Sequence, residues 1–102
     1  EKGANVNAIA NDGWTALFDA AISGHVEIAK VLVEKGINVD QQRSSGLPGA
    51  TSLFMACVKG HRNLAIYLLS VQANPNLGEP EYVPLEKAII NADVELVKEL
   101  FE

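Results

Sequence analysis

The chain has 102 residues, of which 48% are hydrophobic and 21% are charged. This is enough for one domain with a modest core, and it is too apolar for a disordered segment. The formal net charge is −5 and no run of Lys or Arg occurs, which argues against nucleic acid or an anionic membrane surface as a partner.

A first helix is predicted near the start of the chain. Residues 14–21 read Trp-Thr-Ala-Leu-Phe-Asp-Ala-Ala. The hydroxyl of Thr15 can cap a helix that begins at Ala16, and Gly24 can end it in the left-handed conformation. Helical spacing puts three apolar side chains on one face, which predicts the core positions Leu17, Ala20 and Ala21.

A second helix is predicted directly after His25, and it ends at Gly36. Its apolar stripe consists of Val26, Ile28, Ala29, Leu32 and Val33. Residues 38–40 lead into a turn. Residues 42–49, Gln-Arg-Ser-Ser-Gly-Leu-Pro-Gly, then predict an irregular loop.

The same pattern returns at residues 51–57, which read Thr-Ser-Leu-Phe-Met-Ala-Cys. Gly60 and His61 follow, with Gly60 nine residues after Thr51, just as Gly24 stands nine residues after Thr15. Gln72 occupies the place of Gly36 and predicts a strained or reshaped helix end. The predicted core positions of this copy are Leu53, Ala56, Cys57, Leu64, Ala65, Leu68 and Leu69.

An eroded third copy begins at residues 83–88, which read Val-Pro-Leu-Glu-Lys-Ala. Pro84 suits the first turn of a helix, and Asp93 can cap a last helix. The predicted apolar positions of this copy are Leu85, Ala88, Ile89, Val94, Leu96, Val97, Leu100 and Phe101. One such helix pair cannot bury its apolar side alone, so neighbouring copies must cover it.

These recurring positions resemble the ankyrin repeat, whose core phrase is Thr-Pro-Leu-His-x-Ala with Gly-His about nine residues after the Thr. Gly3 and Gly36 stand 33 positions apart, which is the family period. The resemblance implies an all-α repeat solenoid in which each repeat is a β-turn or loop plus an antiparallel helix pair. It implies about three repeats, with a partial one at the N-terminus.

The implied domain organisation is one ankyrin-repeat domain over residues 1–102. It consists of the end of a preceding repeat at 1–9, a repeat at 10–42, a repeat with a three-residue insertion at 43–77, and an incomplete or capping repeat at 78–102. Phe18, Phe54 and Glu86 stand where the family has the His of its core phrase. This change replaces a hydrogen-bond network with ring packing in two repeats. His25 and His61 match the family's structural Gly-His position, where the side chain braces adjacent turns.

The resemblance implies a protein–protein interaction module, a scaffold, adaptor or inhibitor. It would bind a partner protein of unknown identity on the concave face formed by turn tips and first helices. The alternative is a regulatory segment of a larger enzyme or channel. Trp14 and Tyr82 are candidate aromatic anchors, although Trp14 can instead fold over the adjacent turn. The candidate partner-binding residues are Ile9, Asn11, Asp12, Trp14, Asp19, Ile22, Ser23, Leu47, Met55, Lys59, Tyr82 and Lys87.

The residues do not favour catalysis, a cofactor or a metal ion. Cys57 and His61 are four positions apart, but a helix end at Gly60 separates them and Cys57 takes a core position. We therefore expect a protein that is not an enzyme, with a single cysteine that suits an intracellular location, cytoplasmic or nuclear. Repeat ends left uncovered would favour self-association.

Overall fold

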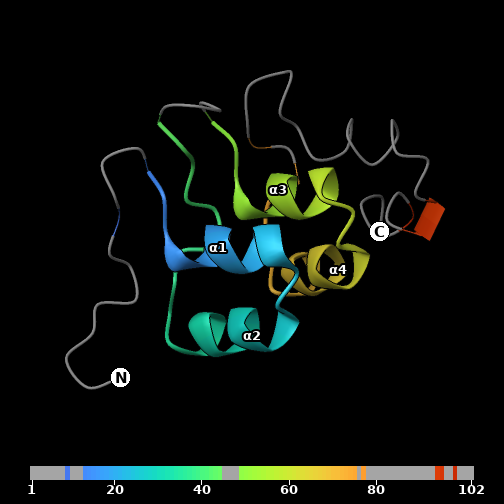
Figure 1. Ribbon diagram of the computed structural model, residues 1–102, viewed down its shortest axis with the longest axis horizontal. Helices are drawn as coiled ribbons and strands as arrows, with labels where there is room; N and C mark the ends of the chain where they lie inside the picture. The colour runs from blue at the N-terminus through green and yellow to red at the C-terminus, as the bar shows by residue number, and fades with distance from the viewer. Residues whose placement is uncertain are drawn as a thin grey trace.

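The computed structural model describes residues 9, 13–44, 49–75, 77, 94, 95 and 98. Two helical hairpins occupy the two long described stretches (Figure 1). The first hairpin joins α1 (Ala16–Ser23) to α2 (Val26–Glu34), and the second joins α3 (Ser52–Val58) to α4 (Arg62–Ser70). Among these described residues no strand is present.

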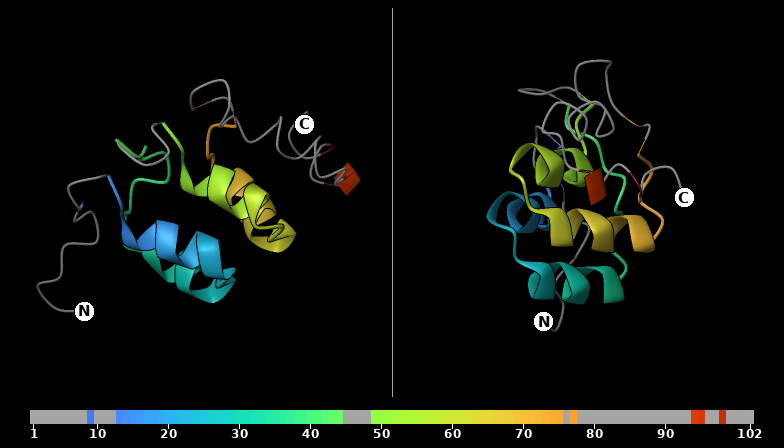
Figure 2. Two further views of the ribbon diagram at one scale, coloured as in Figure 1. Left: turned by 45° about the horizontal axis from the view of Figure 1, so that its top comes forward. Right: turned by 90° about the vertical axis from the view of Figure 1, so that its right-hand side faces the viewer.

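The two hairpins lie side by side, so that α1 contacts α3 and α2 contacts α4. Figures 1 and 2 show α1 and α3 as neighbouring helices that run in the same direction. The prediction that neighbouring helix pairs cover one another is therefore confirmed for these two hairpins. The α1–α3 contact is the larger of the two contacts between hairpins, so the first helices carry most of the packing.

Small side chains allow α1 and α3 to approach closely. Ala20 and Ala21 of α1 are 2% and 0% exposed, and Ala56 and Cys57 of α3 are 0% and 3% exposed. Leu17 and Leu53 are fully buried at equivalent positions of the two helices. The predicted core positions of both first helices are thus confirmed. Phe18 and Phe54 also lie in this core, where their rings fill the space between helices.

The apolar stripe predicted for α2 is only partly buried. Ala29 is fully buried, and Val26, Leu32 and Val33 are half-buried against the core. Ile28, another member of the predicted stripe, is 50% exposed and is not buried. The physical reason is that α1 and α4 cover the other sides of α2, and none of the described segments covers the side that carries Ile28.

Most of the predicted third copy lies outside the described residues. Of its predicted apolar positions, only Val94 is described; it is helical and 65% exposed. The predicted cap at Asp93 and the helix start at Pro84 fall on residues that are not described.

The end of α4 is strained rather than reshaped. Gln72 has a backbone φ of +74°, in the region that favours glycine. The N–H of Ala73 donates to the Leu68 carbonyl at 3.0 Å, and the N–H of Ile37 donates to the Leu32 carbonyl at 3.1 Å after Gly36. The two helix ends therefore make the same hydrogen bond. Keeping this geometry with a side chain at residue 72 costs about 1 kcal/mol.

The two predicted threonine caps behave differently. The N–H of Phe54 donates to the Thr51 hydroxyl at 3.2 Å, which satisfies one free donor at the start of α3. Thr15 precedes α1 but makes no side-chain cap, so the predicted capping role of its hydroxyl is wrong. That hydroxyl is buried and has no hydrogen-bond partner among the described residues. A buried polar atom in this state costs stability.

This difference can be tested with one substitution at two equivalent positions. Thr51→Val removes a cap and should lower the free energy of unfolding by about 1 kcal/mol. Thr15→Val removes only a buried, unpartnered hydroxyl, so it should leave the free energy of unfolding within about 0.5 kcal/mol or raise it. Urea denaturation followed by circular dichroism measures both values. Equal losses in the two variants would show that Thr15 has a partner.

Candidate functional site

A cluster of four side chains joins the start of α1 to the connection that follows α2. Trp14 donates from Nε1 to the Asp19 carboxylate at 2.8 Å. Its ring stacks on Phe18 with 5.2 Å between centroids and 28° between planes. The guanidinium carbon of Arg43 lies 4.7 Å from the centroid of the Trp14 ring, a cation–π distance. We call these four residues, Trp14, Phe18, Asp19 and Arg43, the Trp14 cluster.

Main-chain hydrogen bonds hold Arg43 in this position. The N–H of Arg43 donates to the Ala50 carbonyl at 2.9 Å, and the N–H of Gly49 donates to the Arg43 carbonyl at 2.8 Å. Gln42 donates from Nε2 to the Gly49 carbonyl at 3.0 Å. These bonds close the base of the predicted loop. A Cβ at Gly13 would lie 2.6 Å from the Gln42 carbonyl oxygen, so the two turn regions are in direct contact.

The exposed sides of α1 and α3 form a second feature. Ile22 of α1 is half-buried, and Val58, its equivalent in α3, is 38% exposed. Beside them, Ser23 and Lys59 are exposed at the next pair of equivalent positions. Because α1 and α3 are neighbouring parallel helices, equivalent positions lie next to one another. We call Asp19, Ile22, Ser23, Val58 and Lys59 the first-helix surface.

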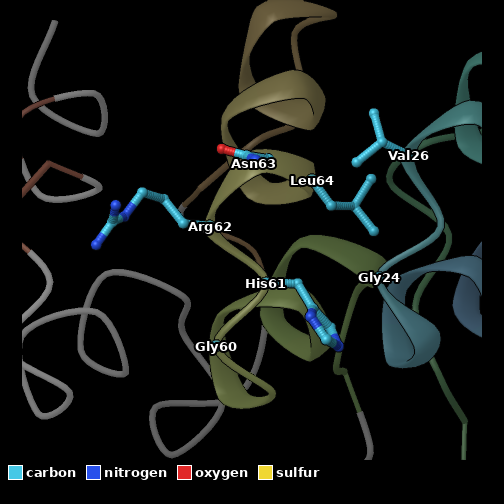
Figure 3. A pocket seen from close by; sticks show the side chains of 7 residues that line it. All are labelled: Gly24, Val26, Gly60, His61, Arg62, Asn63 and Leu64. Carbon is cyan, nitrogen blue, oxygen red and sulfur yellow. The ribbon is translucent and has the colours of Figure 1, made fainter.

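A histidine joins the two hairpins at the far end of α1. His61 Nε2 donates to the Ile22 main-chain carbonyl at 2.9 Å. Figure 3 shows the His61 ring projecting toward Gly24, at the edge of a pocket of about 450 Å³. A Cβ at Gly24 would lie 2.7 Å from His61 Nδ1, so the ring lies directly against the glycine backbone. The predicted brace between adjacent turns is observed for His61, whereas His25 is exposed.

The structure places the predicted partner-binding residues in different environments. Asp19, Ser23 and Lys59 are exposed and Ile9 is 53% exposed, as a binding surface requires. Trp14 and Ile22 are half-buried. Met55 is 6% exposed, so its predicted place on an exposed surface is wrong. It packs in the core between the hairpins. The candidates that lie outside the described residues are Asn11, Asp12, Leu47, Tyr82 and Lys87.

Two members of the Trp14 cluster, Phe18 and Arg43, were not candidates at the sequence level. Arg43 lies far from Trp14 in the sequence, and no local pattern indicates that the two side chains meet. The sequence left two roles open for Trp14, and its contacts with Phe18, Asp19 and Arg43 favour the packing role.

The described residues hold no group of three or more His, Cys, Asp or Glu side chains placed to bind a metal ion. Cys57 lies buried in the core. Among the helices described, none has the length and apolar character to cross a bilayer.

Comparison with known proteins identifies the family. A family model described as ankyrin repeats, with three copies, matches residues 1–43. The chain is 33% identical over 97 residues to ankyrin repeat and SAM domain-containing protein 6 of Mus musculus, covering 92% of the chain and 11% of that protein. It is 31% identical over 98 residues to protein phosphatase 1 regulatory subunit 27 of Mus musculus, covering 96% and 61%.

A third relative is the Notch-regulated ankyrin repeat-containing protein of Homo sapiens, 33% identical over 66 residues, which covers 65% of the chain and 55% of that protein. The chain belongs to the ankyrin repeat family. It spans less than two thirds of the length of each of these relatives.

The ankyrin assignment confirms the predicted all-α repeat solenoid, of which α1–α2 and α3–α4 are two hairpins. Ankyrin repeats are in general protein–protein interaction modules, and the relatives named above are regulatory or repeat-containing proteins. The repeat boundaries given for this ankyrin chain remain predictions.

The brace between the two ankyrin hairpins leads to a matched pair of glycine variants. Gly24 and Gly60 both have positive φ, at 76° and 75°, but only at Gly24 would a Cβ meet His61. Gly60→Ala should lower the free energy of unfolding by about 1 kcal/mol through backbone strain. Gly24→Ala should cost about 2 kcal/mol because it also displaces His61 from the Ile22 carbonyl. Urea midpoints measure both.

A protein without the His61 side chain serves as the control for the two glycine substitutions. In a His61→Ala protein the two glycine substitutions should cost the same, because the side chain that distinguishes them is gone. Costs that are already equal in the native background would contradict the role given to His61.

The Trp14 cluster predicts a spectroscopic change. Trp14 is the only tryptophan in the chain. Removing the Arg43 guanidinium with Arg43→Gln should change the Trp14 emission spectrum and lower the free energy of unfolding by about 0.5–1 kcal/mol. Lys59→Gln removes one positive charge directly after α3 and serves as the matched control. Identical emission from both variants would show that Arg43 does not lie over the Trp14 ring.

Proposed function

We propose that this chain binds a partner protein through its first-helix surface and the adjacent turn tips, without catalysing a reaction. The observation that carries this proposal is the pair of neighbouring parallel helices that present equivalent side chains on one side. Ile22 and Val58 supply apolar area, and Asp19 and Lys59 supply charges of both signs beside it. An apolar centre with a charged rim is the composition of a protein–protein contact surface.

The rigidity of the platform supports this role. The first-helix surface stands on a core of buried residues, and the His61–Ile22 hydrogen bond fixes one hairpin to the other. The Trp14 cluster fixes the start of α1 to the following turn region. Side chains that are already held in place lose little freedom on binding, which favours affinity.

A second candidate is a regulatory segment that packs against other parts of a larger protein. Support comes from the relatives, since one carries a SAM domain in its name and the chain corresponds to 11% of it. Another is named as a regulatory subunit of protein phosphatase 1. For either function we propose a location inside the cell, where the thiol of a single cysteine such as Cys57 stays reduced.

Charge-changing variants on two sides of the stack test the proposed surface. Ser23→Arg with Lys59→Glu alters the first-helix surface. Ser70→Arg with Lys35→Glu places the same two substitutions at exposed positions at the ends of the second helices, Ser70 as the last residue of α4 and Lys35 directly after α2. The native chain, used as bait in an extract of its own cells, identifies a binding protein by mass spectrometry. Titration of that purified protein should then show at least about tenfold weaker binding to the first variant only.

The second-helix variant is the control for net charge and for folding. Its affinity for the captured protein should stay within about threefold of the native value, or about 0.6 kcal/mol. Loss of binding in the second-helix variant alone, or in neither variant, would place the contact elsewhere and reject the first-helix surface.

A further inference from the structure

Asp19 is the only charged residue within α1 and α3, the two helices that carry the first-helix surface. Its side chain is exposed, and its Oδ1 accepts the hydrogen bond of 2.8 Å from Trp14 Nε1. Residues three or four positions apart are neighbours on a helix, and no residue at that distance from Asp19 is a cation. The carboxylate is therefore held in one orientation, and the described residues supply no ion pair to it.

The Trp14 indole that holds Asp19 is itself fixed. Its ring stacks on Phe18 at 5.2 Å between centroids, and the Arg43 guanidinium carbon lies 4.7 Å from its centroid. Both contacts are made with the ring, whereas the bond to Asp19 is made from Nε1 at the ring edge. The described residues give Asp19 this one hydrogen bond, so Oδ2 can accept another from a molecule outside the chain.

Two other carboxylates in the described part of the chain are in different situations. Glu27 of α2 is exposed, but its Oε2 lies 3.7 Å from the Lys30 ammonium nitrogen. Asp40 is half-buried, and its Oδ1 accepts from the N–H of Asn74 at 2.9 Å. Glu27 thus has a cation in its own helix, and Asp40 joins two turn regions. Asp19 instead combines an exposed carboxylate with an orientation that is fixed before any partner binds.

We propose that Asp19 is a specificity-determining residue of the first-helix surface and accepts a hydrogen bond from an arginine side chain of the partner protein. This inference rests on the function proposed above and names the chemistry of the partner. A carboxylate that is already oriented loses little freedom on binding. Ile22, one turn further along α1, is half-buried and offers apolar area beside it. A guanidinium is more weakly hydrated than an ammonium, so arginine is favoured over lysine next to apolar area.

Selection from a library of short random peptides tests this inference without the natural partner. The library is selected on the native chain, on Asp19→Asn and on Glu27→Gln. Asparagine keeps an oxygen for the Trp14 N–H and removes the charge. Arginine should be at least about threefold more frequent in peptides selected on the native chain than in those selected on Asp19→Asn.

Glu27→Gln is the matched control for net charge. The native chain has a net charge of −5, which attracts basic peptides at long range wherever they dock. Both substitutions reduce this charge by the same amount. Arginine enrichment on Glu27→Gln should therefore match that on the native chain, and a loss equal to that on Asp19→Asn would show that only net charge matters.

A selected peptide, made synthetically, then tests the support that Trp14 gives to Asp19. Trp14→Phe keeps an aromatic ring beside Phe18 and removes the N–H donor. It should weaken peptide binding by about threefold in the native background and cause no further loss in Asp19→Asn. Isothermal titration calorimetry measures the affinities, and circular dichroism checks that each variant is folded. An equal loss in both backgrounds would reject the positioning role of Trp14.

Two further results of the selection would overturn the inference. One is an arginine frequency on Asp19→Asn that equals the native value, and the other is lysine enriched as strongly as arginine. The protein captured with the native chain separates this failure from failure of the proposed function. If Ser23→Arg with Lys59→Glu weakens that complex and Asp19→Asn does not, the surface stands and the arginine contact is rejected. If neither change weakens it, the proposed surface itself is rejected.

Discussion

A short helical hairpin cannot bury all sides of its first helix, and the contact between α1 and α3 is the solution found in this protein. The contact works because alanine and cysteine occupy the positions where the two helices meet, which lets the backbones approach. Burial of Leu17, Leu53 and the two phenylalanines depends on that approach. The placement of the turn regions and of the exposed side of the helices follows from it.

The elements that the sequence predicts well are those decided within one hairpin. The start of α3 follows from Thr51, and the helix ends follow from Gly24 and Gly36, because these residues act on their own backbone. The buried positions of α1 and α3 follow from helical spacing and from the small residues there. These features need no knowledge of the neighbouring repeat.

The elements that the sequence predicts poorly are those decided between hairpins. Met55 and Asp19 occupy equivalent positions, yet one is buried and the other exposed, because only the second hairpin has a described neighbour on that side. Ile28 belongs to the predicted apolar stripe of α2, but it is half-exposed because no described segment covers its side of that helix. The Trp14 cluster depends on Arg43, whose position follows from the closure of a turn region rather than from helical spacing.

Two helix ends in this protein carry a residue that lowers the stability of the fold. The buried hydroxyl of Thr15 and the left-handed Gln72 both violate rules that hold within a single repeat. Each stands at a helix end whose main-chain hydrogen bonds are nevertheless kept, such as the bond from Ala73 to Leu68. These main-chain hydrogen bonds keep the helix ends in the repeat geometry even where the residue is poorly suited.

Main-chain hydrogen bonds from Arg43 to Ala50 and from Gly49 to Arg43 join the two ends of the connection between the hairpins. The chain therefore enters α3 from a fixed point, whatever the length of the segment between Arg43 and Gly49. Extra residues placed inside the closed segment would not have to displace the helix that follows. Lengthening a closed segment is entropically inexpensive, about 0.6 kcal/mol for each doubling of its length. This position is therefore a natural point of variation, at which new recognition sequences can be grafted while the helical framework stays unchanged.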